Sequence, residues 1–239
     1  MGAPETEVVE LSAADGALVS EFYRTVLRPS FRDDELVNEG ELLETIDLGT
    51  CHVLVVRDDD GTVLGGAVGD WYESSRVQLL SYLAARPGVR GRGLGTLLVR
   101  AAVDSWVKLL DPLLVVGEVE DPRYYRNTEP DSPYGDVVAR VRFYERLGVR
   151  LLPIPYAQPA LWAGARRVSH LLLMVFAVGT GAAMATDRVD GGVVERFLVE
   201  YFTDMEGQVS DDAELTRLLA ACREPAGLPL LLADELPLP

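Results

Sequence analysis

Cysteine is scarce in this chain, which has only Cys51 and Cys222 among 239 residues. Two cysteines so far apart in the sequence form neither a disulfide framework nor a cluster of metal ligands. Their use favours a reducing, cytoplasmic compartment, and we expect no bound metal ion.

Positive charge is also scarce, because 22 Lys and Arg residues face 38 Asp and Glu residues, for a net charge of −16. A field of that sign repels nucleic acids and anionic membranes, so we expect neither as a partner. No apolar run reaches about 18 residues, and a transmembrane helix is therefore not expected. The first residues, 1–7, lack the basic region and apolar core of a secretory signal.

The most informative segment is glycine-rich and spans residues 89–96, between a predicted strand at 77–86 and a predicted amphipathic helix at 94–110. A turn of this kind presents a row of backbone N–H groups next to the positive end of the helix dipole, which together form an anion site. A Walker loop is excluded because Gly95 is followed by Thr96 rather than lysine. The spacing of the glycines also differs from that of a dinucleotide-binding turn.

The remaining pattern, Arg90-x-x-Gly93-x-Gly95, resembles the coenzyme A signature of the GNAT superfamily of acyl-CoA-dependent N-acyltransferases. A second stretch, Arg142-Phe-Tyr-Glu-Arg-Leu-Gly-Val149, is similar to another landmark of that family, a helix that ends at glycine before an apolar strand. Gly148 fits a helix end because glycine adopts the left-handed conformation that commonly follows the last helical residue.

The resemblance implies an α/β (α+β) fold, with a mixed, mostly antiparallel central sheet of about seven strands flanked by helices. It covers roughly residues 7–178, and we divide the chain into a GNAT domain (1–178) and a linker with a C-terminal helical extension of unknown role (179–239). Hydrophobic periodicity and turn residues predict the order of the elements. Strands are expected at 7–11, 51–57, 62–71, 77–86, 113–119, 149–155 and 168–178, and helices after 12–15 and at 33–48, 94–110, 137–147, 193–202 and from 211.

The resemblance also implies acetyl-CoA as the acyl donor. Free backbone groups of the strand before the glycine-rich turn are expected to pair with the pantetheine arm, and the amides of the turn with the pyrophosphate. The cofactor-binding residues expected on this basis are Leu83, Ala84, Ala85, Arg90, Gly91, Arg92, Gly93, Leu94, Gly95 and Thr96.

Two residues are candidates for proton transfer. Glu118 lies in a stretch similar to the strand of family members that acetylate ribosomal protein N-termini, where a glutamate acts as a base through water. Tyr144 is the candidate general acid for the departing thiolate. The alternatives are a solvated carboxylate at a strand end for Glu118 and a core tyrosine for Tyr144.

The chain departs from the family pattern in two places. Many members carry an asparagine near position 137, where this chain has valine. An insertion at 121–136 is rich in tyrosine, proline and acidic residues, and long ordered loops are commonly functional. We expect it to border the acceptor pocket, together with the loop after the first helix. The candidate acceptor contacts are Phe31, Tyr124, Tyr125 and Tyr134.

The function predicted from these features is transfer of an acetyl group from acetyl-CoA to a primary amine, on a small molecule or a peptide, by direct attack in a ternary complex. A non-catalytic acyl-CoA sensor and transfer of a longer acyl group are the alternatives. The C-terminal helices are possible contacts of a homodimer.

Overall fold

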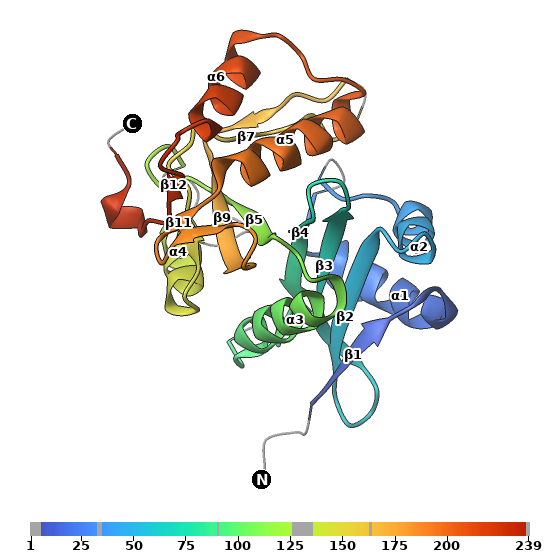
Figure 1. The fold of residues 1–239 in the computed structure, drawn as a ribbon. Coiled ribbons are helices and arrows are strands. Elements are labelled where there is room, and N and C mark those ends of the chain that lie inside the picture. Colours follow the sequence, from blue (N-terminus) through green and yellow to red (C-terminus); the bar gives the residue numbers. More distant parts are fainter. Residues whose placement is uncertain (1–5, 33–34, 90, 126–135, 163, 238–239) are drawn as a thin grey trace. The chain divides into compact units, whose positions relative to one another are not determined.

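The strands fall into two units of the chain in the computed structural model, which describes residues 6–32, 35–89, 91–125, 136–162 and 164–237. The first unit consists of residues 1–71 and 79–109, and the second of residues 72–78 and 110–239. Each unit has its own strands and helices, labelled in Figure 1.

The first unit is built on four strands in the order β1 (Glu7–Leu11), β2 (Cys51–Arg57), β3 (Val63–Tyr72) and β4 (Val77–Ala85), of which Tyr72 and the first two residues of β4 belong to the second unit. β1 and β2 are antiparallel, as are β2 and β3. The hairpin between β2 and β3 turns at Gly61, whose φ of 80° favours glycine. The sequence had predicted all four strands to within one residue at each end.

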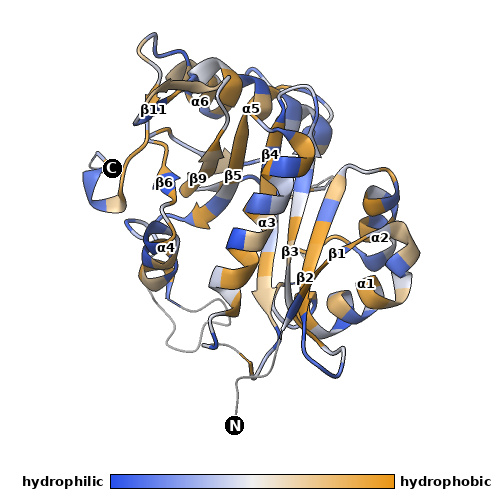
Figure 2. Ribbon diagram, turned by 60° about the horizontal axis from the view of Figure 1, so that its bottom comes forward, coloured by the Kyte–Doolittle hydropathy of each residue, from blue (hydrophilic) through white to orange (hydrophobic). Residues whose placement is uncertain are grey.

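Helices supply the rest of the first unit: α1 (Gly16–Phe22), which continues as a wider turn over Tyr23–Leu27, α2 (Glu39–Asp47) and α3 (Leu94–Leu110). Figure 2 shows apolar and polar residues sharing the surface of α1 and α3, as expected for amphipathic helices. Two separate buried clusters result. One joins Phe22 and Leu42 to β2, and the other joins Leu94 and Leu98 to Val56.

The first cluster depends on a close approach between a helix and the sheet. A Cβ atom added to Gly66 on β3 would lie 2.5 Å from the ring of Phe22, which is fully buried. Glycine is therefore required there, because the ring occupies the space that any side chain would fill. Burying a phenylalanine of this kind stabilises the fold by roughly 2–3 kcal/mol.

The second helix begins later than the sequence predicts. The expected helix covered 33–48, whereas α2 starts at Glu39, where Asn38 accepts a hydrogen bond from the N–H of Glu41 at 2.9 Å. The N–H of Val37 donates to the hydroxyl of Tyr82 at 3.3 Å. Val37 is held by this tertiary contact, and the side chain of Asn38 caps the helix.

The second unit contains β5 (Leu114–Glu120), β9 (Leu171–Val178) and β6 (Arg150–Leu151), in the order β5-β9-β6 and antiparallel at both pairings. Its helices are α4 (Val137–Arg146), α5 (Gly191–Glu206) and α6 (Ala213–Cys222). A two-residue pairing of β7 (Ala157–Gln158) with β8 (Val168–Ser169) forms a hairpin. The beginning of the segment expected to be a linker, after residue 178, contains β10 (Ala183–Ala185) and β11 (Arg188–Val189), and β11 pairs with β12 (Leu228–Pro229).

The last two strands expected from the sequence are shorter than predicted. Of 149–155, only Arg150–Leu151 is a strand, since Pro153 and Pro155 have no N–H to donate to a ladder. The run 168–178 is divided at His170, whose φ of 63° breaks the extended backbone between β8 and β9.

The four strands of the first unit and the three of the second make the seven expected. The pairings β1–β2, β2–β3, β5–β9 and β6–β9 are antiparallel. With the flanking helices, the predicted fold class is confirmed. The division into 1–178 and 179–239 stays a prediction.

Candidate active site

The glycine-rich turn leads directly into α3, which begins at Leu94 as predicted. Gly88, Gly91 and Gly93 have φ angles of 88°, 82° and 79°, a backbone conformation that L side chains rarely adopt. Arg90 lies outside the described residues.

The N–H of Val89 donates to the carbonyl of Arg86 at 3.2 Å, but five later N–H groups of this turn are available to a ligand. Within the described residues, those of Gly91, Arg92, Gly93, Gly95 and Thr96 donate to no backbone carbonyl and no side chain. The first turn of any helix has no intrahelical acceptor for its N–H groups, and the helix dipole adds partial positive charge at the same place. The segment predicted as an anion site therefore contains donors without protein acceptors at a helix start.

The three predicted residues before the turn lie on β4. Leu83 and Ala85 pack with the cluster beneath α3, whereas Ala84 packs with the cluster beneath α1 and α2. This alternation is that of a regular strand. The backbone of β4 also lies close to β3, because a Cβ atom at Gly65 would stand 2.8 Å from the carbonyl oxygen of Ala84.

Two arginines near the turn have different surroundings. Arg86 pairs with Glu21 at 3.1 Å and donates to the hydroxyl of Thr25 at 2.8 Å. Arg86 therefore links the end of β4 to α1 and to the turn that continues it. Arg92 is exposed and has no ion pair with any residue the structure describes, so its guanidinium is available to an anion.

Glu118 is held by two side chains that the sequence had not singled out. The phenol of Tyr156 donates to its Oε1, and the amide Nε2 of Gln158 donates to its Oε2 at 2.6 Å. Both donors come from the segment that enters the β7–β8 hairpin. Glu118 itself lies opposite Leu173 on β9 and is only partly exposed. The carboxylate is therefore fixed in one orientation.

Tyr156 is buried, at 3% exposure, and its pKa is raised well above the usual value for tyrosine. Burial is the largest cause, and the negative charge of Glu118 adds to it, since both disfavour a phenolate. Tyr156 therefore stays protonated at neutral pH and remains a donor. It follows Pro155 in the sequence with no motif around it, and no sequence signal marks it.

Tyr144 lies in the last turn of α4, as predicted, and is 8% exposed. Its ring meets those of Phe143 and Phe176 edge-on, with centroids 5.0 and 5.5 Å away. Burial raises the pKa of its hydroxyl to about 12, while the charge of Arg140 opposes that shift. The hydroxyl therefore stays protonated at neutral pH, a property that suits both a general acid and a core tyrosine. Gly148 ends the helix with a φ of 89°, as expected.

Two tyrosines of the insertion are described, and both contact the junction of β8 and β9. Tyr124 stacks on His170, with ring centroids 4.0 Å apart, and is 46% exposed. Tyr125 donates its hydroxyl to the carbonyl of Ser169 at 2.9 Å. Tyr134, the third predicted acceptor contact, lies outside the described residues.

Phe31, the acceptor contact predicted in the first unit, lies edge-on to Tyr82 with centroids 5.0 Å apart. The hydroxyl of Tyr82 donates to the carbonyl of Glu35 at 3.0 Å and accepts from Val37. The segment after α1 is thus tied to β4 by one tyrosine.

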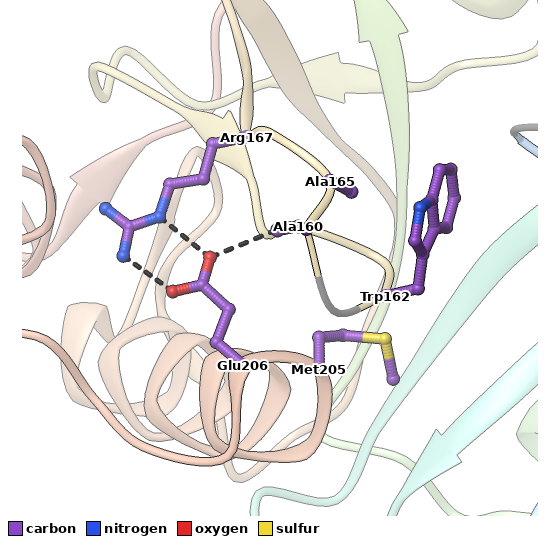
Figure 3. A pocket seen from close by; sticks show the side chains of 7 residues that line it. Ala160, Trp162, Ala165, Arg167, Met205 and Glu206 are labelled. Carbon is purple, nitrogen blue, oxygen red and sulfur yellow. Dashed lines mark hydrogen bonds and ion pairs between the residues drawn. The ribbon is translucent and has the colours of Figure 1, made fainter.

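A pocket of about 410 Å³ lies in the second unit, between the loop of the β7–β8 hairpin and the end of α5. Figure 3 shows Trp162 and Met205 at one side and the paired Arg167 and Glu206 at the other, with Ala160 between them.

Among the described residues no group of three or more potential ligands is arranged to hold a metal ion. In that same part of the chain, no helix has the length and apolar character needed to cross a membrane.

Residues 49–150 match the family described as the acetyltransferase (GNAT) domain. A GNAT-family acetyltransferase structure from Bacteroides thetaiotaomicron superposes with a TM-score of 0.57 at 21% identity, over 82% of this chain and 98% of that one. The ribosomal-protein-S18-alanine N-acetyltransferase from Escherichia coli gives a TM-score of 0.50 at 13% identity, over 76% of this chain and 99% of that one. No curated protein matches the chain. At these identities the two structures show a shared fold.

Proposed function

Because this chain belongs to the GNAT superfamily of acetyltransferases, we propose that it transfers an acetyl group from acetyl-CoA to a primary amine by direct attack in a ternary complex. The observation that carries the proposal is the row of unpaired N–H groups at the start of α3. That arrangement serves little purpose in packing, because it leaves donors without protein acceptors.

The donor set fits a diphosphate. The N–H groups of residues 91–96 are neutral donors next to a helix N-terminus, and the guanidinium of Arg92 adds a positive charge in a chain of net charge −16. We assign the pyrophosphate to these groups and to Arg90. The pantetheine arm is assigned to the backbone of Leu83, Ala84 and Ala85.

The chemistry requires an amine without its proton. At pH 7, neutralising a lysine-like amine costs about 4–5 kcal/mol, and an α-amine with a pKa near 8 costs about 1 kcal/mol. In the proposed reaction Glu118 takes that proton, directly or through water. The amine nitrogen then attacks the thioester carbonyl carbon, the new C–N bond forms, and the C–S bond breaks.

The departing sulfur needs a proton, which we assign to Tyr144. Its pKa of about 12 lies above that of a thiol, so donation is uphill and the gain is modest, at roughly 10²-fold. After the attack the nitrogen still carries one proton too many, and it loses that proton to water. Tyr144 regains a proton from solvent and Glu118 releases its own, so acetylation of a protonated amine releases one proton overall.

The acceptor is proposed to be an amine on a small molecule or a peptide. The acidic surface of the chain favours a cationic acceptor, since opposite charges raise the rate of encounter. Phe31, Tyr124, Tyr125 and Tyr134 are the proposed contacts of its non-reacting part.

Two measurements on the full chain test the proposal. Calorimetric titration with acetyl-CoA should show binding, and mass spectrometry after incubation with acetyl-CoA and a broad amine library should show products heavier by one acetyl group. Absence of heat with acetyl-CoA would overturn the proposed binding site. Binding without any acetylated amine or released thiol would point instead to an acyl-CoA sensor.

A further inference from the structure

The β7–β8 hairpin is tied to the C-terminal helices by one arginine. Arg167, in the hairpin loop, donates from Nε and Nη2 to the two oxygens of Glu206 on α5, at 2.8 and 2.7 Å. Its Nη1 donates to Asp212, the residue that caps α6, at 2.7 Å. The arginine side chain is only 15% exposed, so these bonds are largely shielded from water.

Two more bonds fix the same hairpin. The N–H of Ala160 donates to Glu206 at 3.0 Å, and the hydroxyl of Ser169 donates to Glu214 on α6 at 2.8 Å. The guanidinium of Arg167 also lies over the ring of Phe202, 5.0 Å from its centroid. The loop of the hairpin and β8 are therefore anchored to α5 and α6, and β7 is joined to them through its pairing with β8.

The anchored hairpin carries the two donors that reach Glu118. Gln158 belongs to β7 and Tyr156 immediately precedes that strand. A two-residue ladder has little stability by itself, so its position depends on what else holds it. The carboxylates of α5 and α6 supply that support.

We propose that the C-terminal helices act on catalysis through this chain of contacts: their carboxylates hold the β7–β8 hairpin, and the hairpin positions Glu118 through Gln158 and Tyr156. Gln158, Tyr156 and Arg167 are thus positioning residues. The inference rests on the proposed function, in which Glu118 takes the proton of the amine. It gives a role to α5 and α6, which lie beyond residue 178.

Hydrogen bonds from neutral donors stabilise the ionised form of a carboxylate and fix its orientation. Loss of either donor should therefore raise the pKa of Glu118 and let its side chain rotate. Besides Glu118, the titratable groups that raise the pKa of Tyr156 are the phenols of Tyr201 and Tyr72.

The test compares Gln158→Leu and Arg167→Met in the full chain with two controls. Gln208→Leu removes an exposed amide, and Arg223→Met breaks the ion pair of Arg223 with Glu195 at 2.7 Å, which joins α6 to α5 without touching the hairpin.

Gln158→Leu should lower kcat/KM for the amine about tenfold, as expected for losing a hydrogen bond to a charged group. It should leave the affinity for acetyl-CoA unchanged. Arg167→Met should act in the same direction, and the controls should not.

Combining Gln158→Leu with a substitution of Glu118 distinguishes a positioning role of Gln158 from a general disruption of the structure. In a Glu118→Gln background, Gln158→Leu should cost little more, because the charge that it orients is gone. Equal losses in both backgrounds would overturn the inference.

A readout independent of activity separates this inference from the proposed function. Carbon NMR of protein labelled at its glutamate residues follows the titration of the Glu118 carboxyl in each variant. The signal of Glu118 is identified as the one that is absent from the Glu118→Gln spectrum. The inference predicts a higher pKa in both Gln158→Leu and Arg167→Met, and an unchanged titration in either contradicts it. A raised pKa in a protein that acetylates no amine would instead refute the proposed function.

Discussion

The ring of Tyr144 meets the ring of Phe176 edge-on, at 5.5 Å between centroids, so that α4 is packed on β9 through these two residues. The packing involves the ring and not the hydroxyl, which has no hydrogen-bond partner among the residues the structure describes. Phenylalanine at position 144 therefore preserves the contact while removing the proton.

From this relationship we expect Tyr144→Phe to lower kcat by roughly 10²-fold, the low end for general acid catalysis. The affinity for acetyl-CoA and the melting temperature should stay unchanged. Steady-state kinetics with calorimetry on the same preparation check this. Full retained turnover would remove the acid role and leave Tyr144 as a core residue.

Replacing the candidate base should have an effect that depends on the acceptor. Glu118→Gln keeps the size of the side chain but cannot take a proton, and we expect a loss of about 10²–10⁴-fold in kcat/KM with a lysine-like amine near pH 7. An amine with a pKa near 8 should suffer less, because more of it is already neutral.

The matched control for this prediction is Glu120→Gln, two residues along the same strand, where the carboxylate pairs with Arg140 at 3.0 Å. It should leave the kinetics of both amines near those of the parent chain. Equal rates for the Glu118→Gln variant and the parent with every amine would exclude Glu118 as the base.

A negative charge in the glycine-rich turn should weaken binding of acetyl-CoA. Gly93 and Gly88 both have positive φ, and a Cβ atom added at either meets nothing within 4 Å, so Asp at the two positions imposes similar backbone strain. Gly93→Asp places its charge among the proposed pyrophosphate donors, whereas Gly88→Asp places it before them. We expect calorimetry to show at least a tenfold loss of affinity for the first variant, since that corresponds to about 1.4 kcal/mol of repulsion and lost contacts. Similar affinities for the two would contradict the proposed phosphate site.

The elements around this turn could be predicted because their signals are local. Gly148 ends α4 and Leu94 begins α3 where the sequence predicts, since helix ends depend on a few neighbouring residues. The start of α2 was misplaced because Tyr82, 45 residues away from Val37, holds the segment before it. Local patterns contain no information about such a contact.

The same reasoning explains why the residues that hold Glu118 were missed. Glu118 was found through a family resemblance, but Gln158 and Tyr156 reach it from 40 and 38 residues away. Their position depends on a hairpin of two-residue strands, too short to produce an alternating pattern. Arg167 shows no signal either, because an arginine that follows another arginine in a loop belongs to no motif.

The ion pairs of the hairpin also predict how stability changes with pH. The cap of α6 by Asp212, through the N–H of Leu215, is the largest cause that lowers the pKa of its carboxyl to about 2, and Ser210 and Arg167 lower it further. A carboxyl group with a depressed pKa in the folded state stabilises that state above its unfolded pKa of about 3.9, and this contribution disappears as the pH falls through the folded value. The relevant window therefore runs from about pH 4 down to about pH 2.

Asp212→Asn retains an acceptor for the cap but loses the charge. We expect it to be less stable than the parent at pH 7, by no more than about 1 kcal/mol because the group is partly exposed to solvent. Urea unfolding followed at several pH values should show the difference shrinking through that window, while Asp187→Asn, on an aspartate for which no ion pair is found among the described residues, should show no such trend. A difference that persists unchanged at pH 2 would mean that the charge of Asp212 does not support the contact between the hairpin and α6.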